Sequence, residues 1–249
     1  MQSAAIAALI VLRELPKPDA ACISDTGREA SETWRYLDSV LRPELAKVGV
    51  DLVRLPHSFV GKGWNTVDRW GGADGKTNLS PMYTTFGKDD KLPQTAKYCS
   101  NEWKARPVER YYRSLGLTGG RIWIGFSIDE FHRMRSTNPA AKWNHEYPLV
   151  DRRLNRGDCM ALVTRQMGWP TPPRSSCWMC PYRTDAEWLH LKSKDPRDFT
   201  AAAEFEAEAR GVDPTLFLHR SGVPITEVNL NEAQGDLLQP SCDTGHCFT

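Results

Sequence analysis

The first quarter of the chain alternates apolar and turn-forming segments in the order of a parallel α/β unit. Residues 3–15 are apolar on every face, which predicts a helix packed inside the protein. The apolar runs at 19–24 and 50–55 have the length of strands, and an amphipathic helix is predicted between them at 31–47. Strand, helix and strand at these lengths predict a parallel pair joined by a right-handed crossover.

The remaining pattern predicts more elements of both kinds. Residues 57–91 are rich in Gly, Lys, Asp and Trp, and predict a long loop that is either a lid or a plain connection. Helices are predicted at 95–115 with a break at Pro107, at 156–167, and twice between 185 and 210; strands are predicted at 121–127 and 225–230. The pattern therefore predicts an α/β fold.

Composition narrows the class of protein. The 249 residues carry a net charge of +1, with 40% hydrophobic and 25% charged residues, which is typical of a soluble globular protein and favours one domain. Arg13 and Glu14 interrupt the apolar start, and no basic segment precedes it, so a signal peptide or membrane span is not expected. Seven cysteines without a secretory segment indicate reduced thiols and a cytoplasmic location.

The clearest candidate for chemistry is a Cys-x2-Cys pair, Cys177 and Cys180, in a proline-rich loop. Such a loop directs two thiolates at one metal or cluster, and Cys99 and Cys159 complete a four-sulfur set beside basic segments. Four thiolates suit a [4Fe-4S] cluster or a structural zinc ion. The alternative is that Cys177 and Cys180 are merely small buried residues; Cys22, in an apolar strand, is expected to be core.

A second candidate is the turn Asp25-Thr26-Gly27, which follows the strand predicted at 19–24. Ligands of open α/β sheets bind at the carboxyl ends of strands, so this turn is a candidate nucleotide site. Three basic groups are candidates for holding an anion through bidentate hydrogen bonds, unless they are scattered surface residues. They are Lys104, Arg106 and Arg110; Arg133 and Arg135; and Arg152, Arg153 and Arg156.

Four segments together carry a family resemblance: ISDTGREASETWRYL, CSNEWKARPVERYY, YPLVDRRLNRGDC and SSCWMCPY. The chain resembles the phosphoadenosine phosphosulfate reductase family of the adenine-nucleotide alpha-hydrolase superfamily, and is most similar to its small phage-type and prophage-type members. The resemblance implies a Rossmann-like, mostly parallel sheet with helices on both faces, plus a Cys-rich helical C-terminal part. It also implies an adenine nucleotide at the strand ends and, in many branches, a [4Fe-4S] cluster, which favours iron over zinc.

The resemblance predicts one adenine-nucleotide alpha-hydrolase-like domain over residues 1–249. It comprises a nucleotide-binding part at 1–145, a Cys-containing helical part at 146–240 and a mobile tail at 241–249. The family's first strand and glycine-rich phosphate loop are missing, and Ser3 aligns with the loop's last serine, at a helix N-terminus that suits a phosphate. Either the start site is assigned too late or the protein is degenerate.

Three functions follow. A sulfonucleotide reductase would bind an adenine nucleotide (ATP, APS or PAPS), reduce or transfer its sulfur and use a thiol reductant such as thioredoxin. A nucleic-acid thiolation enzyme or subunit would use ATP to insert sulfur into DNA or RNA. Trp64 and Trp70 suit base stacking, but the small net charge argues against a large nucleic-acid footprint. A degenerate nucleotide-binding protein would lack catalysis, and none of the three requires a membrane.

The chain ends in SCDTGHCFT, where Cys242 and Cys247 flank Gly245 and His246. In the reductases that the chain resembles, a Cys-Gly tail supplies the nucleophile, although here Asp243 and Thr244 separate Cys242 from the glycine. A thiol on a mobile terminus closes over substrate, and a second thiol resolves the adduct as a disulfide. Cys247 and Cys242 are therefore the candidate catalytic residues, and the alternative is a frayed tail with two idle thiols.

Overall fold

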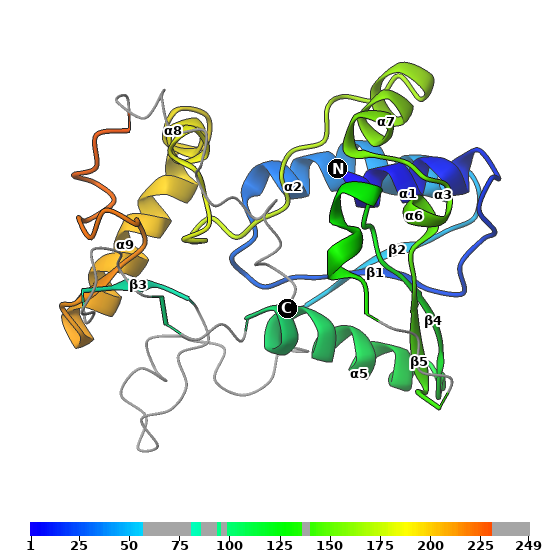
Figure 1. Cartoon of the computed structure of the whole chain (residues 1–249), viewed down its shortest axis with the longest axis horizontal. Coiled ribbons are helices and arrows are strands. Elements are labelled where there is room, and N and C mark those ends of the chain that lie inside the picture. Colours follow the sequence, from blue (N-terminus) through cyan, green and yellow to red (C-terminus); the bar gives the residue numbers. More distant parts are fainter. Residues whose placement is uncertain (57–80, 86–93, 96–98, 136–139, 231–249) are drawn as a thin grey trace. The chain divides into compact units, whose positions relative to one another are not determined.

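The structure is a computed structural model that describes residues 1–56, 81–85, 94–95, 99–135 and 140–230 (Figure 1). Contacts within the chain group it into two compact units. The first unit comprises residues 1–23, 32–55 and 108–175, and the second unit comprises residues 24–31, 56–107 and 176–249. The candidate functional residues are distributed between the two units, which are described separately below.

The N-terminal half of the first unit follows the predicted order. Helix α1 (Gln2–Val11) is followed by strand β1 (Ala21–Ser24), whose hydrogen-bonded neighbour is β2 (Leu52–Leu55). Between the strands, α2 (Ser31–Tyr36), the π-helical turn η1 (Leu37–Leu41) and α3 (Arg42–Ala46) follow one another without a break. The helix predicted at 31–47 and the strands predicted at 19–24 and 50–55 are therefore confirmed, and so is the helix predicted at 3–15, except that it ends at Val11.

The rest of the first unit is built on a second pair of strands. Strand β4 (Gly120–Trp123) runs parallel to β5 (Trp143–Glu146), with Gly120 opposite Trp143. A Cβ atom on Gly119 would lie 2.4 Å from the Lys142 carbonyl oxygen, so this close approach requires glycine. The helical segments are α5 (Arg106–Ser114), which starts in the second unit, the 3-10 helix η4 (Ile128–Arg133), α6 (Pro148–Asp151), α7 (Arg156–Ala161) and the π-helical turn η5 (Leu162–Gln166).

The core of the first unit forms around α1, which is buried along residues 4–10. Helix α1 contacts α6 and α7, and Leu149, Cys159 and Val163 pack in the same cluster (Figure 1). A helix that is apolar all round is stable only when surrounded by other elements, which is the arrangement found here. Burial of these side chains is the main stabilising contribution.

The second unit has a small antiparallel pair, β3 (Tyr83–Thr84) and β6 (Leu216–Phe217), and two long helices. The helices are α8 (Asp185–Lys194), which begins with a capping box between Thr184 and Glu187, and α9 (Pro196–Val212). The π-helical turn η3 (Ser100–Ala105) supplies Trp103, which is buried in the same core as Met179, Trp188 and Leu191.

The mixed helix-and-strand character is confirmed. The Rossmann-like sheet stays a prediction, because the described strands form three two-stranded sheets. The predicted division of a single domain also stays a prediction. Three predictions are wrong. Residues 225–230 form turns rather than a strand, the strand predicted at 121–127 ends at Trp123, and the helical stretch of η3 and α5 runs through Pro107 without the predicted break. The loop predicted at 57–91 lies mostly outside the described residues, and β3 falls within it. Among the described helices, none is long and apolar enough to cross a membrane.

Candidate functional site

The turn after β1, at the start of the second unit, is held by hydrogen bonds to its own side chains. The Asp25 carboxylate accepts a 2.6 Å hydrogen bond from the Gly27 N–H, and Gly27 has a φ of 64°, which favours glycine. Thr26 is fully buried, and its hydroxyl accepts a hydrogen bond from the Arg28 N–H at 3.3 Å. The side chains of Asp25 and Thr26 thereby fix the backbone on which they stand.

The next residues pair with the Cys-x2-Cys loop. The Ala30 N–H donates to the Ser176 carbonyl at 3.1 Å, and the Trp178 N–H donates to the Arg28 carbonyl at 2.8 Å. Glu29 and Cys177 lie opposite each other in an antiparallel bridge. The predicted nucleotide turn and the predicted thiol loop, about 150 residues apart in the sequence, are therefore neighbours.

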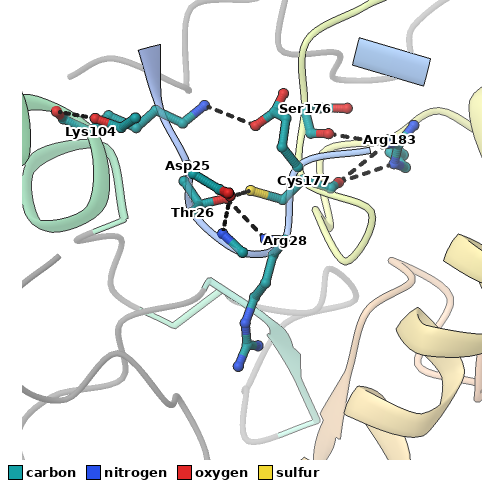
Figure 2. Close-up of polar contacts among 10 residues, drawn as sticks. Asp25, Thr26, Arg28, Lys104, Ser176, Cys177 and Arg183 are labelled. Carbon is teal, nitrogen blue, oxygen red and sulfur yellow. Dashed lines mark hydrogen bonds and ion pairs between the residues drawn. The ribbon is translucent and has the colours of Figure 1, made fainter. Parts of the chain in front are cut away.

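Figure 2 shows the side-chain contact that joins these two segments. The Thr26 Oγ1 lies 3.5 Å from the Cys177 Sγ, within the range of a hydrogen bond to sulfur. Burial raises the pKa of the Cys177 thiol to about 12, and Glu29 also raises it, while Lys104 and the Thr26 hydroxyl lower it in part. Cys177 is therefore a neutral thiol at pH 7 in the metal-free protein, and a bound metal would have to displace its proton.

The Cys-x2-Cys loop is closed by its own backbone and by a buried arginine. The Cys180 N–H donates to the Cys177 carbonyl at 3.1 Å. Arg183, which is 5% exposed, donates to the same carbonyl from Nε at 3.3 Å and from Nη2 at 3.2 Å (Figure 2). Its Nη2 also lies 3.5 Å from the Ser176 carbonyl oxygen. The Arg183 guanidinium thus fixes the orientation of two successive carbonyl groups, those of Ser176 and Cys177.

Lys104 brings a positive charge from η3 to the same place. Its Nζ lies 4.0 Å from the Glu29 carboxylate, and its carbonyl accepts a hydrogen bond from the Ser24 hydroxyl at 3.2 Å. Burial lowers the pKa of Lys104, but the negative charge of Glu29 raises it, as do Cys177, Cys99 and Cys180 in their thiolate forms, and the net pKa lies above its ordinary value. Lys104 is therefore placed to offset negative charge on the Glu29 carboxylate and on these sulfurs once they lose their protons.

Arg28 lies behind the turn in an aromatic environment. Its guanidinium is 4.7 Å from the ring centre of Phe205, 5.8 Å from Trp178 and 5.9 Å from Trp103. Burial lowers the pKa of Arg28, and the negative charges of Cys177 and Glu208 raise it in part. These contacts attach the turn to the core of the second unit.

The structure places only three of the four cysteines predicted as ligands in the same unit. Cys99, Cys177 and Cys180 belong to the second unit, whereas Cys159 belongs to the first and is buried in its core. Burial and the negative charge of Asp158 raise the pKa of Cys159 to about 11. The thiols suit a soft metal or a cluster chemically, but within the described ranges no three His, Cys, Asp or Glu side chains converge closely enough to hold a metal ion.

The other predicted residues lie as follows. Ser3 is exposed in the first turn of α1, and Arg106 is exposed at the start of α5. Arg156 begins α7 in the first unit, where its N–H donates to the Asp129 carboxylate at 2.6 Å. Cys22 is half-buried in β1, with its sulfur 3.7 Å from the Tyr112 hydroxyl. Cys242 and Cys247 lie outside the described residues.

Three residues of the site were missed by the sequence analysis: Arg28, Glu29 and Arg183. Arg28 and Glu29 have partners far along the chain, so no local pattern marks them, whereas Arg183 donates to carbonyl groups six and seven residues before it. A weak signal existed in two charged residues directly after the Asp-Thr-Gly turn and one directly after the Cys-x2-Cys loop. Comparison of the chain with family models, characterised proteins and solved structures found no match.

Proposed function

We propose that the second unit carries the nucleotide and thiol centre of a phosphoadenosine phosphosulfate reductase-like enzyme of sulfur metabolism. The observation that carries this proposal is the contact between Thr26 and Cys177. It joins two features that the sequence predicts independently, an adenine-nucleotide turn and a metal-binding thiol loop. An enzyme that transfers sulfur from a nucleotide needs these two features side by side.

The nucleotide would bind at Asp25, Thr26 and Gly27. Gly27 is exposed and has no side chain, so a phosphate or ribose can approach its backbone closely. The Lys104 side chain is 33% exposed and its ammonium group lies 4.0 Å from the Glu29 carboxylate, so it would supply the positive charge for a sulfate or phosphate group bound at the turn. The pairing with Glu29 holds this ammonium group where its charge acts on the Cys177 thiol.

Cys177, Cys180 and Cys99 would supply thiolates to a [4Fe-4S] cluster, or to zinc in the alternative, and a further ligand would complete the set. The cluster, when bound, would supply a redox-active iron–sulfur centre next to the nucleotide. Arg183 would keep the loop carbonyls turned so that both thiols of the pair remain on one side of the turn. Lys104 would balance the negative charge that the sulfurs acquire on losing their protons.

The experiment is anaerobic purification followed by iron, sulfide and zinc analysis, with a calorimetric titration of ATP, APS and PAPS. We expect about four irons and four sulfides per chain, lost in Cys177→Ser and Cys180→Ser but kept in the matched variant Cys22→Ser. Asp25→Ala should weaken nucleotide binding while the protein stays folded. Stoichiometric zinc in place of iron would indicate a structural zinc ion instead of a cluster. Unchanged nucleotide affinity in Asp25→Ala would show that the nucleotide binds elsewhere.

The activity itself is tested by release of sulfite from APS or PAPS in the presence of reduced thioredoxin. Sulfite release that depends on Cys177 would support a reductase. A protein that binds nucleotide and iron but releases no sulfite from either compound would contradict the reductase proposal.

A further inference from the structure

A buried histidine in the second unit lies between a carboxylate and an exposed hydroxyl group. His219 is 4% exposed and follows β6. Its Nε2 lies 3.0 Å from the Asp185 carboxylate oxygen Oδ1, and its Nδ1 lies 2.7 Å from the Ser221 hydroxyl. Asp185 is 7% exposed, and its other oxygen lies 3.5 Å from Nη2 of Arg220.

These contacts select one tautomer of His219. A carboxylate accepts hydrogen bonds only, so Nε2 must carry the proton that faces Asp185. In the neutral ring Nδ1 then has a free lone pair, which accepts from the Ser221 hydroxyl and from the Ser221 N–H at 3.2 Å. A hydroxyl, an imidazole and a carboxylate connected in this order make the imidazole a general base toward the hydroxyl.

The surrounding backbone holds this arrangement in place. Glu206 of α9 accepts the N–H of Leu218 at 2.7 Å and the N–H of Ile225 at 2.6 Å, so one carboxylate fixes both sides of the turn that carries His219. The Gly222 N–H donates to the His219 carbonyl at 3.1 Å, and Gly222 has a φ of 66°. Ser221 is the exposed member of the arrangement, and its hydroxyl is therefore open to a substrate.

We propose that Ser221 is a nucleophile activated by His219 and Asp185, and that it accepts an acyl group from a carboxylic ester. The Ser221 oxygen attacks the carbonyl carbon while its proton moves to Nδ1 of His219. The ester C–O bond then breaks, and the imidazolium returns the proton to the departing oxygen. The products are an acyl-serine and an alcohol, and no oxidant or reductant takes part.

This site is distinct from the thiol site, because its nucleophile is oxygen and its chemistry needs neither a nucleotide nor a metal. The opposing interpretation is that Ser221 only caps the turn, since its N–H and hydroxyl both contact Nδ1. The two interpretations differ in reactivity: a capping serine reacts as slowly as any surface serine, whereas an activated serine reacts with electrophiles selectively.

The test is to treat the full-length protein with a fluorophosphonate probe and to locate the modified residues by peptide mass mapping. The serine oxygen bonds to phosphorus, the P–F bond breaks, and the serine proton leaves with fluoride. Ser193 is the internal control, because it is exposed on α8 and its hydroxyl donates to the His190 backbone carbonyl at 3.1 Å. We expect Ser221 to react roughly 100-fold faster than Ser193, the lower end of general-base catalysis.

Variants separate activation from accessibility. Ser221→Ala should remove the label, and His219→Gln should reduce labelling of Ser221 to the rate of Ser193. Acetylation of Ser221 by phenyl acetate should show the same dependence. Equal labelling of Ser221 and Ser193 in the unaltered protein would overturn the proposal without any variant, and so would labelling of Ser221 that is unchanged in a folded His219→Gln protein.

Discussion

The hydroxyl of Thr26 lies 3.5 Å from the sulfur of Cys177 and also accepts the Arg28 N–H. A single buried side chain thus contacts both its own turn and the thiol loop. Any change in the turn caused by a bound nucleotide would alter the surroundings of the Cys177 thiol directly. The proposed nucleotide and thiol functions are therefore coupled through one oxygen atom.

Replacing this hydroxyl tests the coupling. Thr26→Val keeps the shape but leaves the Arg28 N–H without its acceptor, so we expect a loss of about 1–3 kcal/mol in the free energy of unfolding. The pKa of Cys177 should rise, because the hydroxyl lowers it. Urea unfolding and the pH profile of Cys177 alkylation measure the two effects in the metal-free protein. Thr200→Val, at an exposed hydroxyl on α9, is the matched control and should change neither.

Lys104→Met should slow alkylation of Cys177 by iodoacetamide at a fixed pH. The ammonium lowers the pKa of the Cys177 thiol, so its removal raises that pKa and reduces the thiolate fraction. Peptide mapping of the metal-free protein gives the rate at this residue alone. Lys47→Met removes a lysine from an exposed pair with Glu44 and should leave the rate unchanged. Faster alkylation in Lys104→Met would show that the ammonium mainly shields the sulfur.

Arg183→Lys should destabilise the protein although the charge is kept. A lysine cannot donate from two nitrogens in one plane to the Cys177 carbonyl, and the expected loss is roughly 1.5–3 kcal/mol in the free energy of unfolding. Arg197→Lys, at an exposed position on α9, should cost almost nothing. Chemical unfolding of both variants decides whether the loop depends on guanidinium geometry or on charge alone.

Glu206→Gln should change how stability depends on pH. Burial raises the pKa of Glu206 above its ordinary value of 4.5, and the two backbone hydrogen bonds lower it only in part. A carboxyl group with a raised folded pKa stabilises fully below pH 4.5, and this contribution is lost as the pH rises through the folded pKa. The unfolding free energy of the native protein minus that of Glu206→Gln should therefore fall from acid to neutral pH. A difference that grows over this range would contradict the raised pKa.

The helices were predictable because their signals are local. Helix α1 is apolar on all faces, and the helical stretch at 31–46 has a regular apolar stripe, so both were found close to their observed bounds. Strand β5 was not predicted, since Asn144 and His145 interrupt its apolar pattern and only its pairing with β4 makes it a strand. Residues 225–230 were wrongly predicted as a strand because their apolar pattern reflects burial and not strand pairing. Ile225 and Leu230 are buried core residues, but the Ile225 N–H bonds to Glu206 rather than to a strand.

The candidate site was predictable in its chemistry and not in its assembly. Asp25, Thr26, Cys177 and Lys104 were each selected from the sequence, but their proximity depends on pairing between residues 28–30 and 176–178. Such pairing is set by tertiary contacts that no short pattern encodes. The same limit applies to His219, which is an ordinary histidine in sequence: Ser221 lies two residues away, but Asp185 becomes its partner through the placement of α8 beside the turn after β6.

Neither compact unit is continuous in the sequence, because the chain passes from one to the other at residues 23/24, 31/32, 55/56, 107/108 and 175/176. Each unit must therefore collect three separate segments before its core is complete, so a ribosome-bound chain cannot finish the first unit until residue 175 has emerged. A single protease cut between the units would release neither of them, and no simple truncation would yield the second unit alone. Dissecting this protein requires point substitutions rather than fragments, since each unit is assembled from three segments that alternate along the chain.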